Sequence, residues 1–338
     1  MKKAIVARMT SYWRSVLIWS GLGVWVLLGC GVAQGANDPW VLAGTSSGAF
    51  LRLSQGATWT LDKNVASGFS SIGGVGGVSS GDMFVLDSST VYRYRYSGTP
   101  YPGVGYTGAK FVNGPDMFGD IYAWMGRMIA GPDNKLYITM TNHNLGVIRV
   151  DPVTGARQTV ASTAVAPAGG MAFGPDANGD GNSDLYVGNS TGGVTVYNTT
   201  ILSPATPITT LNTAAPNNIV GLAFYGNNMV AATTWADDKL HVYDALTGAP
   251  INLGLGSGVF STDGAFNHTG DLGVGYNGNL YAMESYGGAV RMYLPSGGPS
   301  TPVPGSSGYF AMGFYNLPEP ASLALLALGG LMLLRRRR

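Results

Sequence analysis

The chain has 338 residues, 19 of them basic and 18 acidic, and its single cysteine, Cys30, excludes an intramolecular disulfide. Fifty-two glycines among abundant Thr, Val and Tyr favour short strands joined by tight turns over helices. Without residues 1–36 and the four terminal arginines, 11 basic residues remain against 18 acidic ones, a net charge of about −7, which argues against nucleic-acid binding.

Residues 1–36 have the organisation of a secretory signal peptide. The basic residues of this leader are Lys2, Lys3, Arg8 and Arg14. The apolar stretch Val16–Val32 follows, and the small residues Ala33 and Gly35 suit cleavage by signal peptidase before Asn37. Two alternatives stay open: a retained N-terminal anchor helix, because the leader is long, and lipoprotein processing at Cys30. We expect an exported protein.

A strand pattern returns along residues 37–316 with a period near fifty residues. Each copy has an apolar strand, a polar turn, a strand of the type "LYV", a short loop, a strand of the type "VxVY" and a weaker last strand. The second residue of the "LYV" strand falls at Phe84, Tyr137, Tyr186, Val230 and Tyr281, in steps of 53, 49, 44 and 51. A degenerate copy begins at Trp40. Four-stranded units at this spacing are typical of propeller blades.

The sequence therefore predicts an all-β fold, a single β-propeller with six four-stranded blades. Seven blades are the alternative, if the stretch Val65–Val78 contains more strands. The first copy lacks a preceding inner strand, while "GYFAMGFYN" (Gly308–Asn316) resembles an inner strand without followers. We expect these N- and C-terminal strands to pair and close the ring without an exposed edge. The repeats resemble the NHL/YVTN class of bacterial propellers, which implies the fold and no functional residues.

Two further segments allow more than one interpretation. The run "GGVGG" (Gly73–Gly77) has no helix after it, so we interpret it as a flexible loop and not as a phosphate-binding loop. The run "VYRYRY" places Tyr92, Tyr94 and Tyr96 on one face of a strand and its arginines on the other. This alternation predicts a core-facing tyrosine row, and a stacking platform for carbohydrate is the alternative.

The segment "PDANGDGNSDLYVG" matches a calcium loop. Its candidate ligands are Asp176, Asn178, Asp180, Asn182 and Asp184, and Gly181 allows the sharp turn. Flanking strands, and Val187 where an EF-hand has a bidentate glutamate, exclude an EF-hand. With "FG" before it and "LYVG" after it, the segment resembles the FG-GAP repeat of integrin-like propellers, which implies one structural Ca²⁺. A polar hairpin turn is the alternative. Because three carboxylates repel one another, we expect a loose loop without the cation.

Side chains suited to catalysis are few. Glu284 is the only glutamate in the propeller region, and it lies on a second strand, whereas propellers that resemble gluconolactonases use Glu, Asn and Asp at inner-strand ends. His241 lies on a strand, and His143 and His268 lie in loops. His268 precedes Asp271 by three residues, a pair that suits general-base chemistry of the streptogramin-lyase kind at a channel mouth. We favour a non-catalytic protein, with a secreted channel lyase or lactonase as the alternative.

Residues 317–338 form a tripartite terminal tag. Pro318, Glu319 and Pro320 precede the apolar run Leu323–Leu334, which is about 18 Å long as a helix and shorter than an ordinary bilayer span. The chain then ends in Arg335, Arg336, Arg337 and Arg338. This order resembles the PEP-CTERM sorting signal of Gram-negative bacteria. The resemblance implies transient anchoring in the inner membrane by a short transmembrane helix, and cleavage near Pro-Glu-Pro by an exosortase-type membrane protease.

These features predict three parts: a signal peptide (1–36), a β-propeller domain (37–316) and a sorting segment (317–338). The expected destination is the cell surface or the extracellular matrix. The expected function is binding of a protein or polysaccharide ligand, with Ca²⁺ in a structural role.

Overall fold

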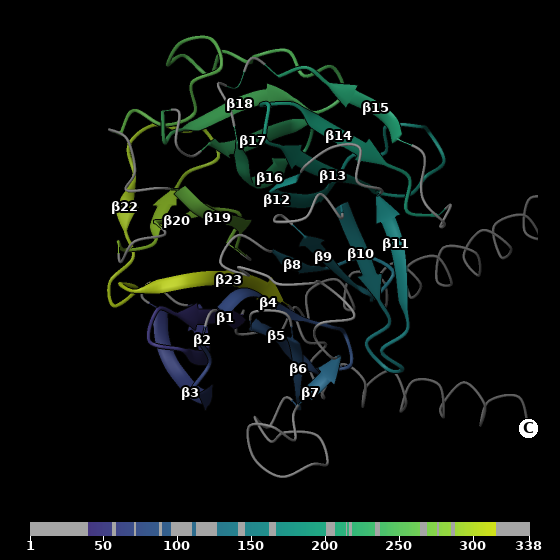
Figure 1. The fold of residues 1–338 in the computed structure, drawn as a ribbon. Coiled ribbons are helices and arrows are strands. Elements are labelled where there is room, and N and C mark those ends of the chain that lie inside the picture. The colour runs from purple at the N-terminus through teal and green to yellow at the C-terminus, as the bar shows by residue number, and fades with distance from the viewer. Residues whose placement is uncertain are drawn as a thin grey trace, which may run out of the picture. The chain divides into compact units, whose positions relative to one another are not determined.

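Six antiparallel sheets surround a common axis between Asp38 and Leu317 (Figure 1). The computed structural model describes residues 40–55, 59–70, 72–87, 90–95, 110–112, 127–140, 146–161, 167–200, 207–213, 215, 218–233, 237–263, 269–275, 277–284 and 288–315. Within these ranges no helix is long and apolar enough to cross a membrane. The predicted all-β propeller with six blades is confirmed.

Four of the blades are built from four strands that follow one another in the chain, the first innermost. The second blade is β4 (Ile72–Gly77), β5 (Met83–Asp87), β6 (Thr90–Tyr94) and β7 (Lys110–Val112). The third is β8 (Met128–Ala130), β9 (Leu136–Met140), β10 (Gly146–Val150) and β11 (Arg157–Ala161). The fourth is β12 (Pro167–Gly174), β13 (Asp184–Asn189), β14 (Val194–Tyr197) and β15 (Pro207–Leu211). The sixth is β19 (Thr269–Val274), β20 (Leu280–Glu284), β21 (Arg291–Tyr293) and β22 (Thr301–Pro302).

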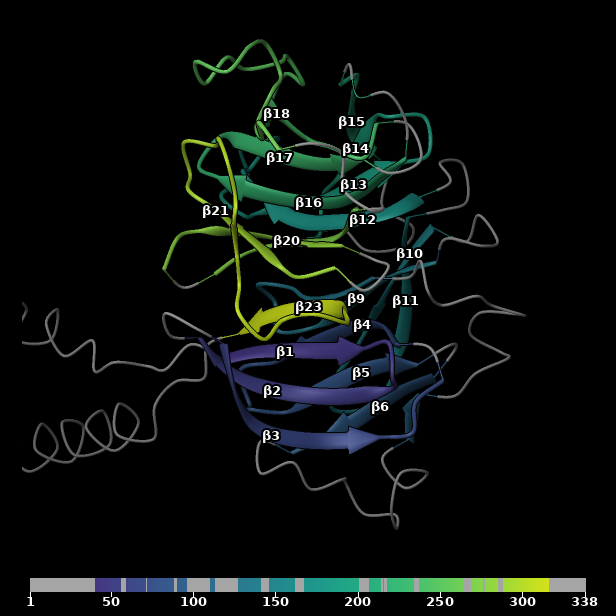
Figure 2. The same ribbon diagram turned by 90° about the vertical axis from the view of Figure 1, so that its left-hand side faces the viewer.

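The first blade joins the two ends of the domain. It contains β1 (Trp40–Thr45), β2 (Ala49–Gln55) and β3 (Trp59–Ser67), with β23 (Tyr309–Tyr315) as its innermost strand. β23 pairs antiparallel with β1, and Leu42 lies opposite Gly313. Figure 2 shows β23 beside β1, with β2 and β3 outside it. The predicted closure of the ring by N- and C-terminal strands is confirmed, and it gives β1 a partner on its inner side.

The fifth blade has three strands in its sheet: β16 (Ile219–Tyr225), β17 (Asn228–Thr233) and β18 (Leu240–Asp244). Residues 249–260 run along its outer edge, where a fourth strand lies in the other blades. Isolated bridges join Tyr243 to Pro250 and His241 to Val259. The backbone N–H of Val242 also donates to the carbonyl of Gly258 at 3.1 Å. These bridges provide hydrogen-bond partners for backbone groups on the outer edge of β18, although no continuous fourth strand pairs with it.

The interpretation of Gly73–Gly77 as a flexible loop is wrong. These residues belong to β4, the buried innermost strand of the second blade, so the stretch Val65–Val78 contains no seventh blade. The glycines are needed where neighbouring blades approach the axis. A Cβ on Gly74 would lie 2.6 Å from the backbone nitrogen of Met128 in the next blade.

The hydrophobic core consists of six clusters, each between two neighbouring blades. Strands in the middle of a blade are therefore buried on both faces, as in β13, which is buried throughout, while outer strands such as β15 are partly exposed. Tyr92 and Tyr94 are buried, which confirms the core-facing interpretation for these two. Tyr96 lies outside the described residues.

Candidate functional site

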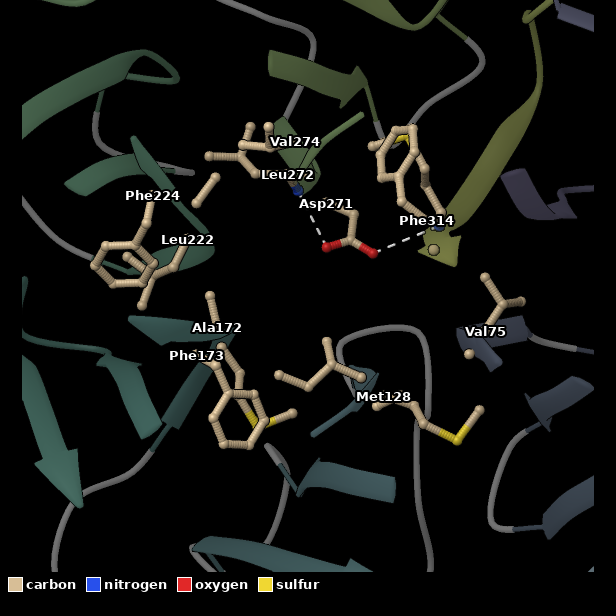
Figure 3. Close-up of a pocket in the computed structure, with 18 of the residues that line it drawn as sticks. Val75, Met128, Ala172, Phe173, Leu222, Phe224, Asp271, Leu272, Val274 and Phe314 are labelled. Carbon is tan, nitrogen blue, oxygen red and sulfur yellow. Dashed lines mark hydrogen bonds between the residues drawn. The ribbon is translucent and has the colours of Figure 1, made fainter. Parts of the chain in front are cut away.

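A cavity of about 360 Å³ lies on the propeller axis, where the innermost strands of all six blades meet (Figure 3). Equivalent positions on these strands contribute a layer of apolar side chains: Val75, Met128, Met171, Leu222, Leu272 and Met312. Phe173, Phe224 and Phe314 lie two residues further along their strands and also line the cavity. Among the described residues that line the cavity, only Asp271 has a charged side chain. The described side chains of the cavity wall are thus apolar except for Asp271, and polar backbone groups contribute part of the surface.

Arg127 and Asp271 meet across one end of this cavity. The residue that precedes the apolar layer is small in four blades: Gly74, Gly170, Gly221 and Ala311. In the third and sixth blades, which stand opposite each other in the ring, it is Arg127 and Asp271. Arg127 Nε lies 3.8 Å from Asp271 Oδ1, and one guanidinium nitrogen donates to the carbonyl of Gly73 at 3.3 Å. The side chains of Arg127 and Asp271 therefore occupy the space that the small residues leave at the axis.

The carboxylate of Asp271 is held mainly by backbone groups. Its Oδ1 accepts a hydrogen bond from the N–H of Leu272 at 3.0 Å, and its Oδ2 accepts a weak one from the N–H of Met312 at 3.5 Å. Burial raises the pKa of Asp271, and the positive charge of Arg127 lowers it, but burial is the larger effect.

The other candidate catalytic residues do not join Asp271 in the described part of the chain. His143 and His268 lie outside the described residues. His241 is on β18, with Nε2 2.9 Å from a carboxylate oxygen of Asp237. Glu284 lies on β20, as predicted away from the cavity lining, and accepts a hydrogen bond from Arg291 Nε at 2.9 Å.

The predicted calcium loop connects β12 to β13. The carboxylate of Asp176 accepts hydrogen bonds from four successive backbone N–H groups, those of residues 178–181, at 2.6–3.2 Å. Asp180 accepts one from the N–H of Asn182 at 2.9 Å and one from Asn198 Nδ2 at 2.7 Å. These hydrogen bonds define the conformation of the turn between β12 and β13.

Asp184 lies at the end of this loop, at the first position of β13, and it is almost fully buried. Its Oδ2 accepts a hydrogen bond from the N–H of Ala177 at 2.7 Å, whereas its buried Oδ1 has no hydrogen-bond partner among the described residues. Burial raises the pKa of Asp184, and the charges of Asp176 and Asp180 raise it further. A carboxylate oxygen that is buried, unpartnered and close to two other carboxylates is suited to a cation.

The described side chains nowhere place three His, Cys, Asp or Glu groups in an arrangement ready to hold a metal ion. The sorting-signal residues, Pro318 to Pro320 and Arg335 to Arg338, lie outside the described residues.

Sequence reasoning missed Arg127 and the pairing of its side chain with Asp271. The signal was available in the repeat. Aligning the inner strands on Tyr137 and Tyr281 puts Arg127 and Asp271 in the same column, where the other blades have glycine or alanine. Two oppositely charged residues in a column of small residues, placed in blades that face each other, indicate a contact across the ring.

No family model and no curated protein matches this chain. Among solved structures, it is similar to a chain of the nidogen/laminin complex at 11% identity and a TM-score of 0.57, covering 82% of this chain and 98% of that one. The WD40 propeller domain of Doa1 matches at 11% identity and a TM-score of 0.53, covering 81% and 82%. A gluconolactonase from Xanthomonas campestris matches at 13% identity and a TM-score of 0.49, covering 80% and 86%. At 11% identity the first two matches show a β-propeller fold and nothing about function, because a fold does not imply a function.

Proposed function

We propose that this protein is an exported β-propeller of the cell surface or extracellular matrix that binds a protein or polysaccharide without catalysing a reaction. The observation that supports the proposal best is a set of exposed apolar side chains at one end of the ring. We call this end, formed by the turns after the first and third strands of each blade, the turn face. Neighbouring strands in a blade are antiparallel, so all of these turns lie together.

In the described part of the chain, three large apolar side chains are exposed on the turn face. Val153 follows β10, Leu246 follows β18 and Leu294 follows β21, and they are 71%, 44% and 58% exposed. Each lies after the third strand of its blade, in a turn whose other residues are polar or glycine in large part. Burying such side chains against a partner gains about 25 cal/mol per Å² of apolar surface. Their shared position favours a ligand that spans several blades.

The test is binding of the purified, labelled protein to glycan arrays and to surface and matrix material of the producing cells. We expect binding that is lost when Val153, Leu246 and Leu294 are all replaced by Ser. The matched control is Leu61→Ser, because Leu61 is 60% exposed but lies on β3, the outer strand of the first blade. Binding that survives the triple substitution would contradict the role of the turn face.

Delivery to this location is proposed from the two terminal segments. The leader 1–36 directs export through signal peptidase. The PEP-CTERM-like segment 317–338 anchors the protein in the inner membrane until an exosortase-type protease cleaves it. A structural Ca²⁺ held by Asp176, Asn178, Asp180, Asn182 and Asp184 belongs to the same proposal. The buried, unpartnered Oδ1 of Asp184 supports it, and the ion would brace the turn between β12 and β13.

The alternative, a lyase or lactonase that acts in the channel, is tested with the same purified protein. Turnover of a lactone or polyuronate substrate that disappears on His268→Ala would overturn the non-catalytic proposal. Turnover that is unaffected by that substitution would point to a contaminating enzyme.

A further inference from the structure

The axial cavity has no part in binding through the turn face, yet it has the properties of a small-molecule site. Its volume of about 360 Å³ lies within the range of roughly 300–1,000 Å³ that is typical of ligand pockets. Such pockets are mostly apolar and carry a few polar groups that orient the ligand. Among the described lining residues the charged side chain is that of Asp271, whose carboxylate points into the cavity from the wall formed by β19 (Figure 3).

The charge that a ligand would meet in this cavity is negative. Arg127 does not line it, and its guanidinium turns toward the carbonyl of Gly73 at the end of the channel. The ion pair is also loose, because 3.8 Å between Arg127 Nε and Asp271 Oδ1 exceeds hydrogen-bond length. From the described residues, Asp271 Oδ2 receives the weak hydrogen bond of Met312 and no other, although a carboxylate oxygen can accept two.

Three aromatic rings also make the cavity suitable for a cation. Phe173, Phe224 and Phe314 line the cavity from the fourth, fifth and first blades. Aromatic faces attract cations and also pack against apolar groups. An anion would be repelled by Asp271, and a neutral apolar ligand would leave its carboxylate without a further partner at the cavity wall.

We propose that the channel binds a small organic cation, a primary ammonium group on an apolar or aromatic body, with the ammonium group at Asp271. The ammonium donates hydrogen bonds to the carboxylate, and the body displaces water from the apolar layer around Met171 and Leu222. Burial raises the pKa of Asp271 because it disfavours the ionised carboxylate, and a bound cation would offset that cost.

The test compares two probes of the same shape, 2-(1-naphthyl)ethylamine and 2-(1-naphthyl)ethanol, by calorimetry on the purified protein. We expect the amine to bind at least tenfold more tightly than the alcohol. Asp271→Asn should remove this preference and keep the affinity for the alcohol. Because the single substitution removes the negative charge beside the buried Arg127, the double variant Asp271→Asn with Arg127→Met is the second form to measure.

A steric variant locates the bound probe. Ala130 lines the cavity at the position that holds phenylalanine in three other blades, and it is exposed, so Ala130→Phe should fold and fill the space. We expect it to weaken both probes at least tenfold, whereas the turn-face variant Val153→Ser should bind them like the wild type. Equal affinity of the two probes for the wild type, a preference that survives both Asp271 variants, or unchanged binding to Ala130→Phe would each overturn the proposal. Turn-face binding to glycans is unaffected by any of these results.

Discussion

Tyr186 on β13 and Phe224 on β16 pack edge to face across the boundary between the fourth and fifth blades, with ring centroids 4.8 Å apart. The same contact recurs between Tyr137 and Phe173 at 4.9 Å, one blade earlier in the ring. In each pair, the tyrosine lies on the second strand of one blade and the phenylalanine on the innermost strand of the next. The tyrosine column of the repeat therefore joins neighbouring blades.

The first prediction concerns this contact. Phe224→Leu and Tyr186→Leu should each lower the free energy of unfolding, and the double variant should lose less than the sum of the two. The difference between that sum and the loss in the double variant measures the ring–ring interaction, which is worth about 0.5–1.5 kcal/mol beyond burial. Urea unfolding of the four proteins gives the coupling energy. Strict additivity would show that the rings pack independently.

The second prediction uses two glycines of one strand. Gly74→Ala should destabilise the protein by about 1–3 kcal/mol, because the new Cβ would lie 2.6 Å from the backbone of Met128 and the blades would have to move apart. Gly76→Ala is the matched control. Its Cβ would find its nearest neighbour, Leu136, at 3.8 Å, an ordinary contact. Equal melting temperatures for the two variants would contradict close approach of β4 and β8.

The repeat predicted most of the fold, because each blade carries its own strand pattern and its own turns. The column from Phe84 to Tyr281 located the second strand of five blades, and the incomplete ends predicted the closure by β23. What the pattern lacked was long-range information. Gly73–Gly77 is too short and too rich in glycine to resemble a strand by itself, and its burial comes from neighbouring blades. Residues 249–260 of the fifth blade form isolated bridges and no regular strand, so their sequence carries no strand periodicity.

The two candidate sites also differ in how far local sequence could predict them. The calcium loop is local, so alternating Asp and Asn residues from Asp176 onward marked it, although the pattern could not show that backbone N–H groups would occupy Asp176. Arg127 and Asp271 are distant in sequence, and only the closed ring brings them together. Local sequence motifs therefore could not predict a site that forms only when the ring closes.

The third prediction concerns acid stability. Lys135 forms an ion pair with Asp151, and with the N–H groups of Thr154 and Val153 it holds the pKa of Asp151 well below its usual 3.8. A depressed pKa stabilises the folded state above the unfolded pKa, and this contribution is lost as the pH falls from about 4. Asp151→Asn should therefore cost stability at pH 7 and much less at pH 2–3. Both side chains are about a quarter exposed, so we expect about 1 kcal/mol or less. A constant difference in melting temperature from pH 7 to pH 3 would contradict this assignment.

The fourth prediction concerns the terminal tag. If an exosortase-type protease removes the C-terminal segment, the surface or released form should lack Arg335 to Arg338, which intact-mass analysis would show directly. Glu319→Ala should leave the protein at the inner membrane with its arginines retained. A surface form whose mass includes the arginine cluster would exclude cleavage near Pro318.

The last prediction concerns calcium and its effect on the fourth blade. Asp184 is buried with an unpartnered Oδ1 beside two other carboxylates, so its charge destabilises the fold until a cation neutralises it. Ca²⁺ at about 100 times its dissociation constant adds roughly 2.7 kcal/mol to stability. Millimolar Ca²⁺ should therefore raise the melting temperature by several degrees, and EGTA should reverse the rise.

Two substitutions separate this prediction from a plain polar turn. Asp180→Ala should abolish the response to Ca²⁺. Asp184→Asn should abolish it too, and in EGTA it should melt at or above the temperature of the wild type, because it removes the buried charge. Asp133→Asn is the control, since Asp133 lies in the corresponding turn of the third blade and pairs with Arg149 at 3.0 Å. That variant should lose stability yet keep the full calcium response. If wild type and Asp180→Ala melt alike with and without Ca²⁺, the backbone hydrogen bonds to Asp176 are sufficient, and the loop is only a turn.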